Sequence, residues 1–85
     1  MFRKIDIWYS ICDGEVTFDI TETTSINWKY TSYTYKIKDF KYYKDWTNLY
    51  NKVLDDFEAE FDDSLARGLE DIIKLFWKEK DKYAI

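Results

Sequence analysis

Residues 55–71 of the chain read DDFEAEFDDSLARGLED. Eight of these residues are acidic and one is basic, so the segment carries a charge of −7 in a chain whose net charge is −4. Four apolar residues run through it at intervals of four: Phe57, Phe61, Leu65 and Leu69. Apolar residues at that interval line one face of a helix, which leaves the carboxylates on the other faces. The segment therefore predicts helix with an apolar side toward a core and an acidic side toward water or a partner.

The apolar residues around Glu60 fall into two helical stripes. The first consists of Trp46, Leu49, Tyr50, Val53, Leu54, Phe57 and Phe61. The second consists of Leu65, Leu69, Ile72, Ile73 and Phe76. Its centre is rotated by roughly 110° on a helical wheel, so one straight helix would direct its two halves at different partners. We therefore predict two helices with a break between Glu60 and Ser64, Asp62 or Asp63 as the N-cap of the second helix, and Asp39 as the N-cap of the first.

The N-terminal residues alternate with a period of two, which is typical of half-buried strands. The apolar positions are Ile5, Ile7, Tyr9 and Ile11, followed by Val16, Phe18 and Ile20. Asp13-Gly14 lies between the two runs, and Asp-Gly in such a place favours a tight hairpin because glycine accepts a positive φ. The pattern predicts a β-hairpin with these apolar residues on its inner side.

The next segment is rich in β-formers, but its pattern shifts. A polar stretch at residues 22–25 predicts a turn, and the apolar positions are then even-numbered up to Tyr30 and odd-numbered from Tyr33. A regular strand cannot change the side on which its apolar residues lie without an extra residue. We therefore predict a bulge or a tight turn at Thr31-Ser32, which leaves either one bent strand or two short ones.

These patterns together predict an α+β fold in a single domain of residues 1–85. An antiparallel sheet of three or four strands within residues 2–38 would pack against two helices within residues 41–80, and residues 81–85 would form a frayed tail. Eighteen aromatic residues supply large apolar surfaces for so short a chain. The predicted core consists of Ile5, Ile7, Tyr9, Val16, Phe18 and Ile20 against Leu49, Val53, Phe57, Leu69, Ile72 and Phe76.

Several classes of chemistry lack their usual residues. The chain has no histidine, the commonest general base and metal ligand. Cys12 therefore has no imidazole to activate it, and two isolated glycines make no phosphate-binding loop. A calcium-binding loop that begins at the acidic segment would need glycine where Glu60 or Phe61 stands. We expect no enzymatic activity, no cofactor and no metal.

The single cysteine and the lack of a long apolar run bear on location. One cysteine cannot form an intrachain disulfide, which favours a reducing compartment. No apolar run reaches the ~20 residues of a membrane span. We expect a cytoplasmic protein that does not enter a membrane, in the host cell if a phage encodes it.

The first candidate binding site is the acidic side of the predicted helices. Its residues are Asp55, Asp56, Glu58, Asp62 and Asp63. Helical neighbours three or four residues apart lie about 5–6 Å from one another, a spacing comparable to that of phosphates along a nucleic acid. Such a row is either solvated or matched by a basic partner. We expect a DNA mimic, an anti-defence inhibitor of phage or mobile-element origin that blocks the basic channel of a CRISPR-type nuclease; alternatives are a toxin-neutralising immunity protein and a merely solubilising surface.

The second candidate is the basic and aromatic segment of residues 28–44, WKYTSYTYKIKDFKYYK. Its predicted contacts are Trp28, Lys29, Tyr33, Tyr35, Lys36 and Lys38. Aromatic and basic side chains on a sheet are what single-strand binders use for stacking and phosphate contact. Against this function, nucleic acid repels a net-acidic domain. The favoured alternative is that the odd-numbered tyrosines pack against the helices and the lysines are only solvated. We therefore expect direct nucleic-acid binding only as an alternative.

Overall fold

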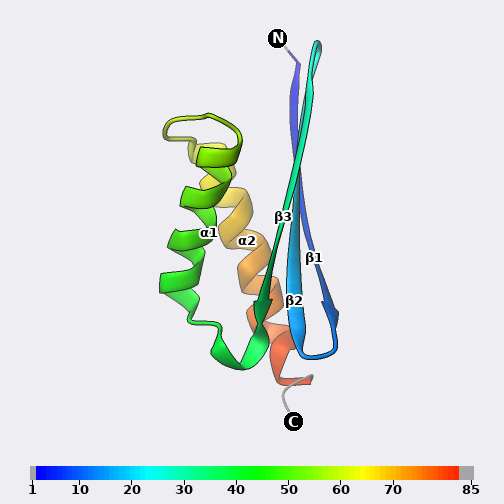
Figure 1. Ribbon diagram of the computed structural model, residues 1–85, viewed down its shortest axis with the longest axis vertical. Coiled ribbons are helices and arrows are strands. Elements are labelled where there is room, and N and C mark those ends of the chain that lie inside the picture. Colours follow the sequence, from blue (N-terminus) through cyan, green and yellow to red (C-terminus); the bar gives the residue numbers. More distant parts are fainter. Residues whose placement is uncertain (1, 83–85) are drawn as a thin grey trace.

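The computed structural model describes residues 2–82, which form two layers, a sheet and a pair of helices on one of its faces (Figure 1). The strands are β1 (Arg3–Cys12), β2 (Glu15–Thr24) and β3 (Trp28–Lys36), and the helices are α1 (Tyr42–Asp56) and α2 (Asp63–Glu79). Short 3-10 helices follow β3 and α2, η1 at Ile37–Asp39 and η2 at Lys80–Lys82. The predicted α+β fold is confirmed, with three strands.

The sheet is an antiparallel meander in the order β1-β2-β3. The predicted hairpin is confirmed, because Cys12 pairs with Glu15 across a two-residue turn. Asp13 and Gly14 in that turn have φ values of 52° and 77°. Two consecutive positive φ angles define a type I′ turn, whose twist matches that of the flanking strands.

The predicted turn at residues 22–25 is displaced, since β2 continues to Thr24 and the turn occupies residues 25–27. Thr24 closes this turn: its N–H donates to the Asn27 carbonyl at 2.8 Å, and its Oγ1 accepts from the Asn27 N–H at 3.0 Å. A threonine hydroxyl that hydrogen-bonds nearby backbone can terminate a strand in this way. Three of the four polar residues, residues 22–24, therefore form the end of β2, and Ser25 begins the turn.

The predicted bulge at Thr31-Ser32 is wrong. β3 pairs with β2 in one unbroken register from Glu15↔Lys36 to Thr23↔Trp28. The shift in the sequence pattern has another cause, because Trp28 and Tyr30 lie on the solvent side of a regular strand, exposed by more than half. Their rings stack on each other, with centroids 6.2 Å apart. Because β3 carries large apolar side chains on both faces, its sequence shows apolar residues at even-numbered and then at odd-numbered positions without any bulge.

The two predicted helices are confirmed, and so is Asp62 as the N-cap of α2: its Oδ1 accepts a hydrogen bond from the Leu65 N–H at 3.1 Å. Asp39 as the cap of α1 is wrong, because it lies in η1 and the N-cap is Lys41. The carboxylate of Asp45 instead reaches back to the Lys41 N–H. Such a return bond from the first turn satisfies a free helix donor, as in a capping box.

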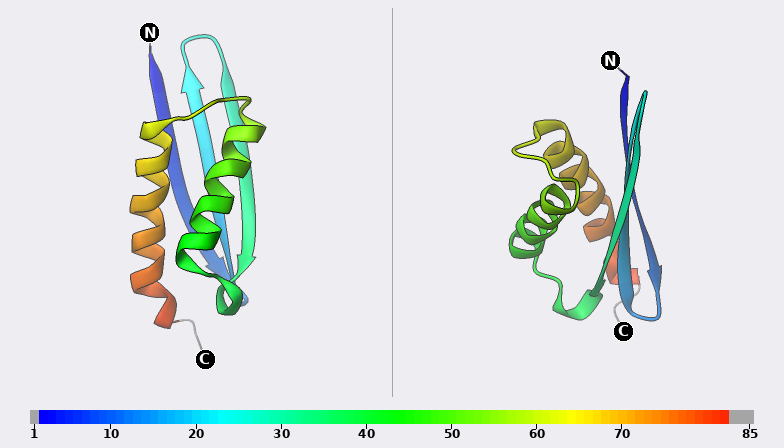
Figure 2. Two further views of the ribbon diagram at one scale, coloured as in Figure 1. Left: turned by 90° about the vertical axis from the view of Figure 1, so that its left-hand side faces the viewer. Right: turned by 45° about the horizontal axis from the view of Figure 1, so that its top comes forward.

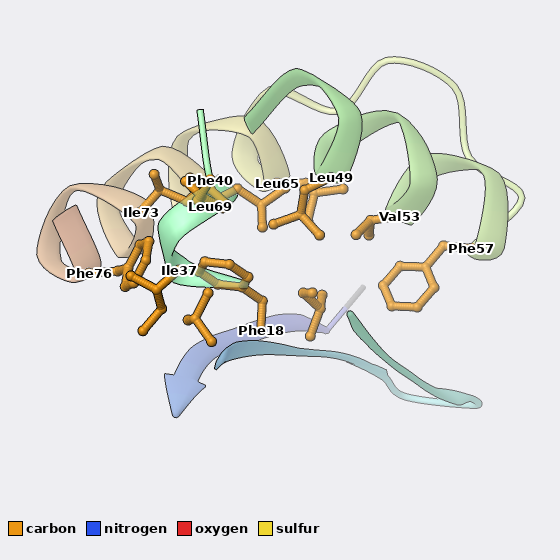
Figure 3. Packing of buried hydrophobic residues seen from close by; sticks show 12 residues of the cluster. Phe18, Ile37, Phe40, Leu49, Val53, Phe57, Leu65, Leu69, Ile73 and Phe76 are labelled. Carbon is orange, nitrogen blue, oxygen red and sulfur yellow. The ribbon is translucent and has the colours of Figure 1, made fainter. Parts of the chain in front are cut away.

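The core lies between the two layers (Figure 3). Its buried residues are Val16, Phe18, Ile20, Ile37, Phe40, Leu49, Val53, Phe57, Leu65, Leu69, Ile73 and Phe76. All predicted core residues belong to this cluster or pack against it at its margin, as Ile5, Ile7, Tyr9 and Ile72 do. Phe40 was not predicted, although its ring lies 5.2 Å from Phe76 at 82° in the favoured edge-to-face geometry.

Within the described part of the chain, no helix covers the other face of the sheet (Figure 2, right). The C-terminal expectation is only partly testable: Asp81 and Lys82 belong to η2, and residues 83–85 lie outside the described residues. No helix in residues 2–82 is long and apolar enough to cross a membrane.

Candidate functional site

The five predicted acids do not share one helical face, because α1 ends at Asp56. Asp55 and Asp56 lie in the last turn of α1, Glu58 follows the helix, and Asp63 begins α2. Asp62 precedes α2 as its N-cap. The acids instead lie along residues 55–63, which include the connection between the two helices at one end of the helical layer (Figure 1). We call residues 55–63 the acidic loop.

The acidic loop begins with a Schellman motif. The Ala59 N–H donates to the Leu54 carbonyl at 2.9 Å, and the Glu58 N–H donates to the Asp55 carbonyl at 3.1 Å. This pair of bonds places Glu58 at the position after the C-cap, which is usually glycine because its backbone is left-handed. Glu58 indeed has a φ of 53°. A glutamate therefore occupies a site at which its side chain costs stability.

A cation from the sheet reinforces this helix end. The Lys29 Nζ donates a hydrogen bond to the Phe57 carbonyl at 2.8 Å. The C-terminus of a helix carries partial negative charge and free carbonyls, so a lysine there stabilises it. Phe57 itself is buried, and its ring lies in the core (Figure 3). Lys29 thus links the C-terminal end of α1 to β3.

The far end of the acidic loop is held by Asp62. Its carboxylate caps α2 and also pairs with the Arg3 guanidinium, which donates a second hydrogen bond to Glu22 at 2.8 Å. Partial burial alone would raise the pKa of Asp62, but the hydrogen bonds from Arg3 and from the Leu65 N–H hold that pKa below its usual value. Asp62 is therefore a structural residue that joins α2 to the sheet.

Tyr50 fastens the backbone at the same place. Its hydroxyl accepts from the Asp62 N–H at 2.9 Å and donates to the Asp62 carbonyl at 3.3 Å. Between these two fixed ends the side chain of Phe61 is 78% exposed. Its expected place in the helical stripe is wrong, because α1 stops before it. The presence of Glu60 within the predicted stripe was the signal that the stripe ended earlier.

The remaining acids differ in whether their side chains form hydrogen bonds or ion pairs. Asp56 accepts a hydrogen bond from the Thr31 hydroxyl at 3.2 Å, and Asp63 pairs with Arg67 at 2.8 Å on the surface of α2. Within residues 2–82 the side chains of Asp55 and Glu58 form no hydrogen bond or ion pair. Exposed pairs such as Asp63–Arg67 contribute little stability and can be exchanged for another partner. Glu60 likewise forms no side-chain hydrogen bond or ion pair within that range, so Asp55, Glu58 and Glu60 are the acids available for binding.

The alternative nucleic-acid site is divided between the two faces of the sheet. Lys29, Tyr33 and Tyr35 face the helices, whereas Trp28 and Lys36 face solvent on the other side and Lys38 lies beyond the strand in η1. These six residues therefore do not share one face of the sheet.

The two inner tyrosines are anchored to α1. Tyr33 donates to the Lys52 carbonyl at 3.1 Å, and the hydroxyl of Tyr35 bonds Asn48 Oδ1 at 3.3 Å. Burial raises the pKa of Tyr35 above its ordinary value. These contacts bear out the other interpretation of the segment, in which the odd-numbered tyrosines pack beneath the helices.

Cys12 is exposed beside the hairpin turn. The negative charge of Asp13 raises the pKa of its thiol, and the Asp13 carboxylate lies 3.6 Å from Sγ. A raised pKa lowers the fraction of thiolate, which is the reactive form. The surroundings of Cys12 are thus the opposite of those that activate a nucleophilic cysteine.

Comparison of the chain with protein-family models, with curated proteins and with solved structures finds no match.

Proposed function

We propose that the protein is a small stoichiometric inhibitor that binds a basic protein surface through the acidic loop. The observation that carries this proposal is Glu58 in a left-handed conformation. Glycine would avoid a cost of about 1–2 kcal/mol at such a position. Backbone strain of this kind gathers at functional sites, where the side chain is retained for another purpose. Here the side chain supplies an unpaired charge.

The exposed ring of Phe61 supports the same surface. A large apolar side chain that stays in water is a candidate anchor for a partner, and aromatic anchors surrounded by polar groups carry much of the energy of protein interfaces. Phe61 follows Glu60 directly and lies within three residues of Glu58. An apolar anchor among acids suits a partner whose pocket is lined by lysine and arginine.

The fixed ends of the acidic loop reduce what binding would cost. The Schellman motif, the Lys29 bond to Phe57 and the contacts of Asp62 with Arg3 and Tyr50 hold the backbone on both sides of Phe61. A loop already in its binding conformation loses less entropy when it meets a partner. The loop therefore offers charge, an anchor and rigidity together.

A target of matching chemistry is an enzyme whose nucleic-acid channel is lined by basic residues. Carboxylates of Asp55, Glu58 and Glu60 would pair with lysines and arginines that otherwise hold phosphates, so the inhibitor would compete with nucleic acid. Asp56 and Asp63 would join after giving up their weak surface partners, whereas Asp62 would stay in place. We would test an RNA-guided nuclease first, and a secreted toxin second.

The test compares two charge-reversed variants in a nucleic-acid cleavage assay. Asp55→Lys combined with Glu58→Lys reverses two of the three available acids. The control combines Asp39→Lys with Asp81→Lys, which changes the net charge equally at exposed positions outside the acidic loop. We expect the first variant to lose inhibition of an RNA-guided nuclease from the same cell while the control inhibits like the wild type. Association should also slow as salt is raised.

Two results would contradict the proposal. Equal inhibition by both variants would reduce the acidic loop to a solvated surface. If a large excess of the protein leaves cleavage by each RNA-guided nuclease of that cell undiminished, these nucleases are not the target. If the wild type neutralises a toxin and the Asp55 and Glu58 variant does not, the proposed binding site stands and the target is a toxin.

A further inference from the structure

β1 is an edge strand whose free backbone groups can be identified. The Thr24 N–H donates to the Asn27 carbonyl, so even-numbered residues of β2 hydrogen-bond to β3. Hydrogen-bonding direction alternates along an antiparallel strand, so the odd-numbered residues of β2 bond to β1, where they pair with even-numbered residues. The N–H and C=O groups of Ile5 and Ile7 therefore point away from the sheet.

A groove runs beside this free edge, between β1 and α2. Its volume is about 510 Å³, within the usual range for ligand sites. Ile5, Ile7 and Ile72 give it an apolar lining. Gly68 allows the close approach of α2 to the strand there, since a Cβ at this position would lie only 2.9 Å from Ile7 Cδ1. The groove is thus open beside backbone groups of Ile5 and Ile7 that pair with no strand within residues 2–82.

α2 extends past the edge of the sheet beside β1 (Figure 2, left). Leu75 follows Gly68 by seven residues, so it lies on the same side of the helix, and it is 45% exposed. Edge strands are ordinarily protected by proline or by inward-pointing charges. The odd-numbered positions from 5 to 9 in β1 are Ile5, Ile7 and Tyr9, and the chain has no proline.

The charges around the groove indicate what it would accept. Arg3 at one end is already paired with Glu22 and Asp62. Asp71, on the helix side, forms no salt bridge within residues 2–82. With a net charge of −4 for the chain, the groove favours a partner that carries a basic side chain at the level of Asp71.

We propose that the β1 edge binds an extended basic segment of a partner protein, which adds to the sheet as a fourth strand. Its backbone would pair with Ile5 and Ile7, alternate apolar side chains would enter the groove, and a lysine or arginine would meet Asp71. Strand addition of this kind takes affinity from main-chain hydrogen bonds and specificity from pockets for alternate side chains. A second copy of the chain is a poorer fit. If its β1 paired with this β1, its α2 would enter the space beside the edge that the first copy's α2 already covers.

The test uses a synthetic peptide in which valine alternates with threonine and lysine, followed by amide hydrogen exchange in the full-length protein. We expect the peptide at saturation to slow exchange of the Ile5 and Ile7 amides, which are free in the unbound protein. The Asp6 amide, which already bonds to β2, should change little. The same peptide with alternate backbone nitrogens methylated should not bind, because its edge can no longer pair with β1.

Charge variants separate this proposal from the acidic loop. Asp71→Lys should weaken peptide binding about fivefold, the upper end for an exposed ion pair. Asp55→Lys makes the same change of charge elsewhere and should leave peptide binding intact. The Asp55 and Glu58 double variant should lose inhibition yet keep the peptide, so either proposal can fail without the other.

Three outcomes would overturn strand addition. Ile5 and Ile7 amides could exchange at an unchanged rate with peptide in excess. The methylated peptide could bind as well as the unmodified one. Alternatively, the protein alone could dimerise with protection of the same amides, which would assign the edge to a second copy.

Discussion

Replacement of Glu58 by glycine should stabilise the protein. Glu58 lies at the left-handed position of the Schellman motif that ends α1, with a φ of 53°. In an L-residue this conformation brings Cβ close to the following carbonyl oxygen, whereas glycine has no Cβ. The two motif hydrogen bonds involve only backbone atoms, so the substitution leaves both of them intact.

The size of the effect is the difference between two terms. Removing the left-handed strain contributes about 1–2 kcal/mol, and the greater freedom of glycine in the unfolded chain costs about 0.5–1 kcal/mol. The net gain is about 0.5–1 kcal/mol. For a domain of this size each kcal/mol shifts Tm by about 4–8 °C, so Glu58→Gly should raise Tm by about 2–8 °C.

Thermal and urea unfolding would measure this gain against two controls. Glu58→Gln keeps the strain and removes the charge, so it isolates any relief of repulsion among the acids. Glu60→Gly introduces glycine at a loop residue without a positive φ and should destabilise slightly. A gain for Glu58→Gln equal to that for Glu58→Gly would refute the backbone explanation. The glycine variant should also inhibit less well, because it lacks one of the three available acids.

Two further predictions concern the ends of the acidic loop. The pKa of Asp62 is lowered in the folded state, so its ion pair should stabilise the protein at neutral pH, and this contribution should be lost as pH falls from about 4 through the folded pKa. In unfolding experiments from neutral to acidic pH, Asp62→Asn should be less stable than the wild type at pH 7, and the difference in stability should disappear in acid. A difference of constant size would contradict this. Phe57→Ala should lower the free energy of unfolding by about 3–5 kcal/mol because the ring is in the core, whereas Phe61→Ala should leave the urea midpoint unchanged because its ring is in water. Equal losses of stability in the two variants would show that Phe61 is also packed.

Local patterns were enough to predict the architecture. The alternation before Asp13-Gly14, the two apolar stripes and the capping residue Asp62 each reflect a period or a turn rule that neighbouring residues determine. The same reasoning failed at Trp28 and Tyr30, because a large ring on the solvent face of a strand has the same sequence signature as one in the core. Hydrophobicity alone does not say which face of the sheet a helix will cover.

The candidate site depended on contacts that no local pattern contains. Phe57 and Phe61 are both apolar and four residues apart, but Phe57 is the C-cap of α1, and its carbonyl accepts a hydrogen bond from Lys29, 28 residues earlier. Asp62 became structural because Arg3, 59 residues away, reached it across the interface between sheet and helices. The sequence by itself thus determined the strands, the helices and the acidic composition of their connection. Only the tertiary structure decided which acids stay free and that β1 lies at an open edge, because both depend on elements distant in the chain that meet only in the folded protein.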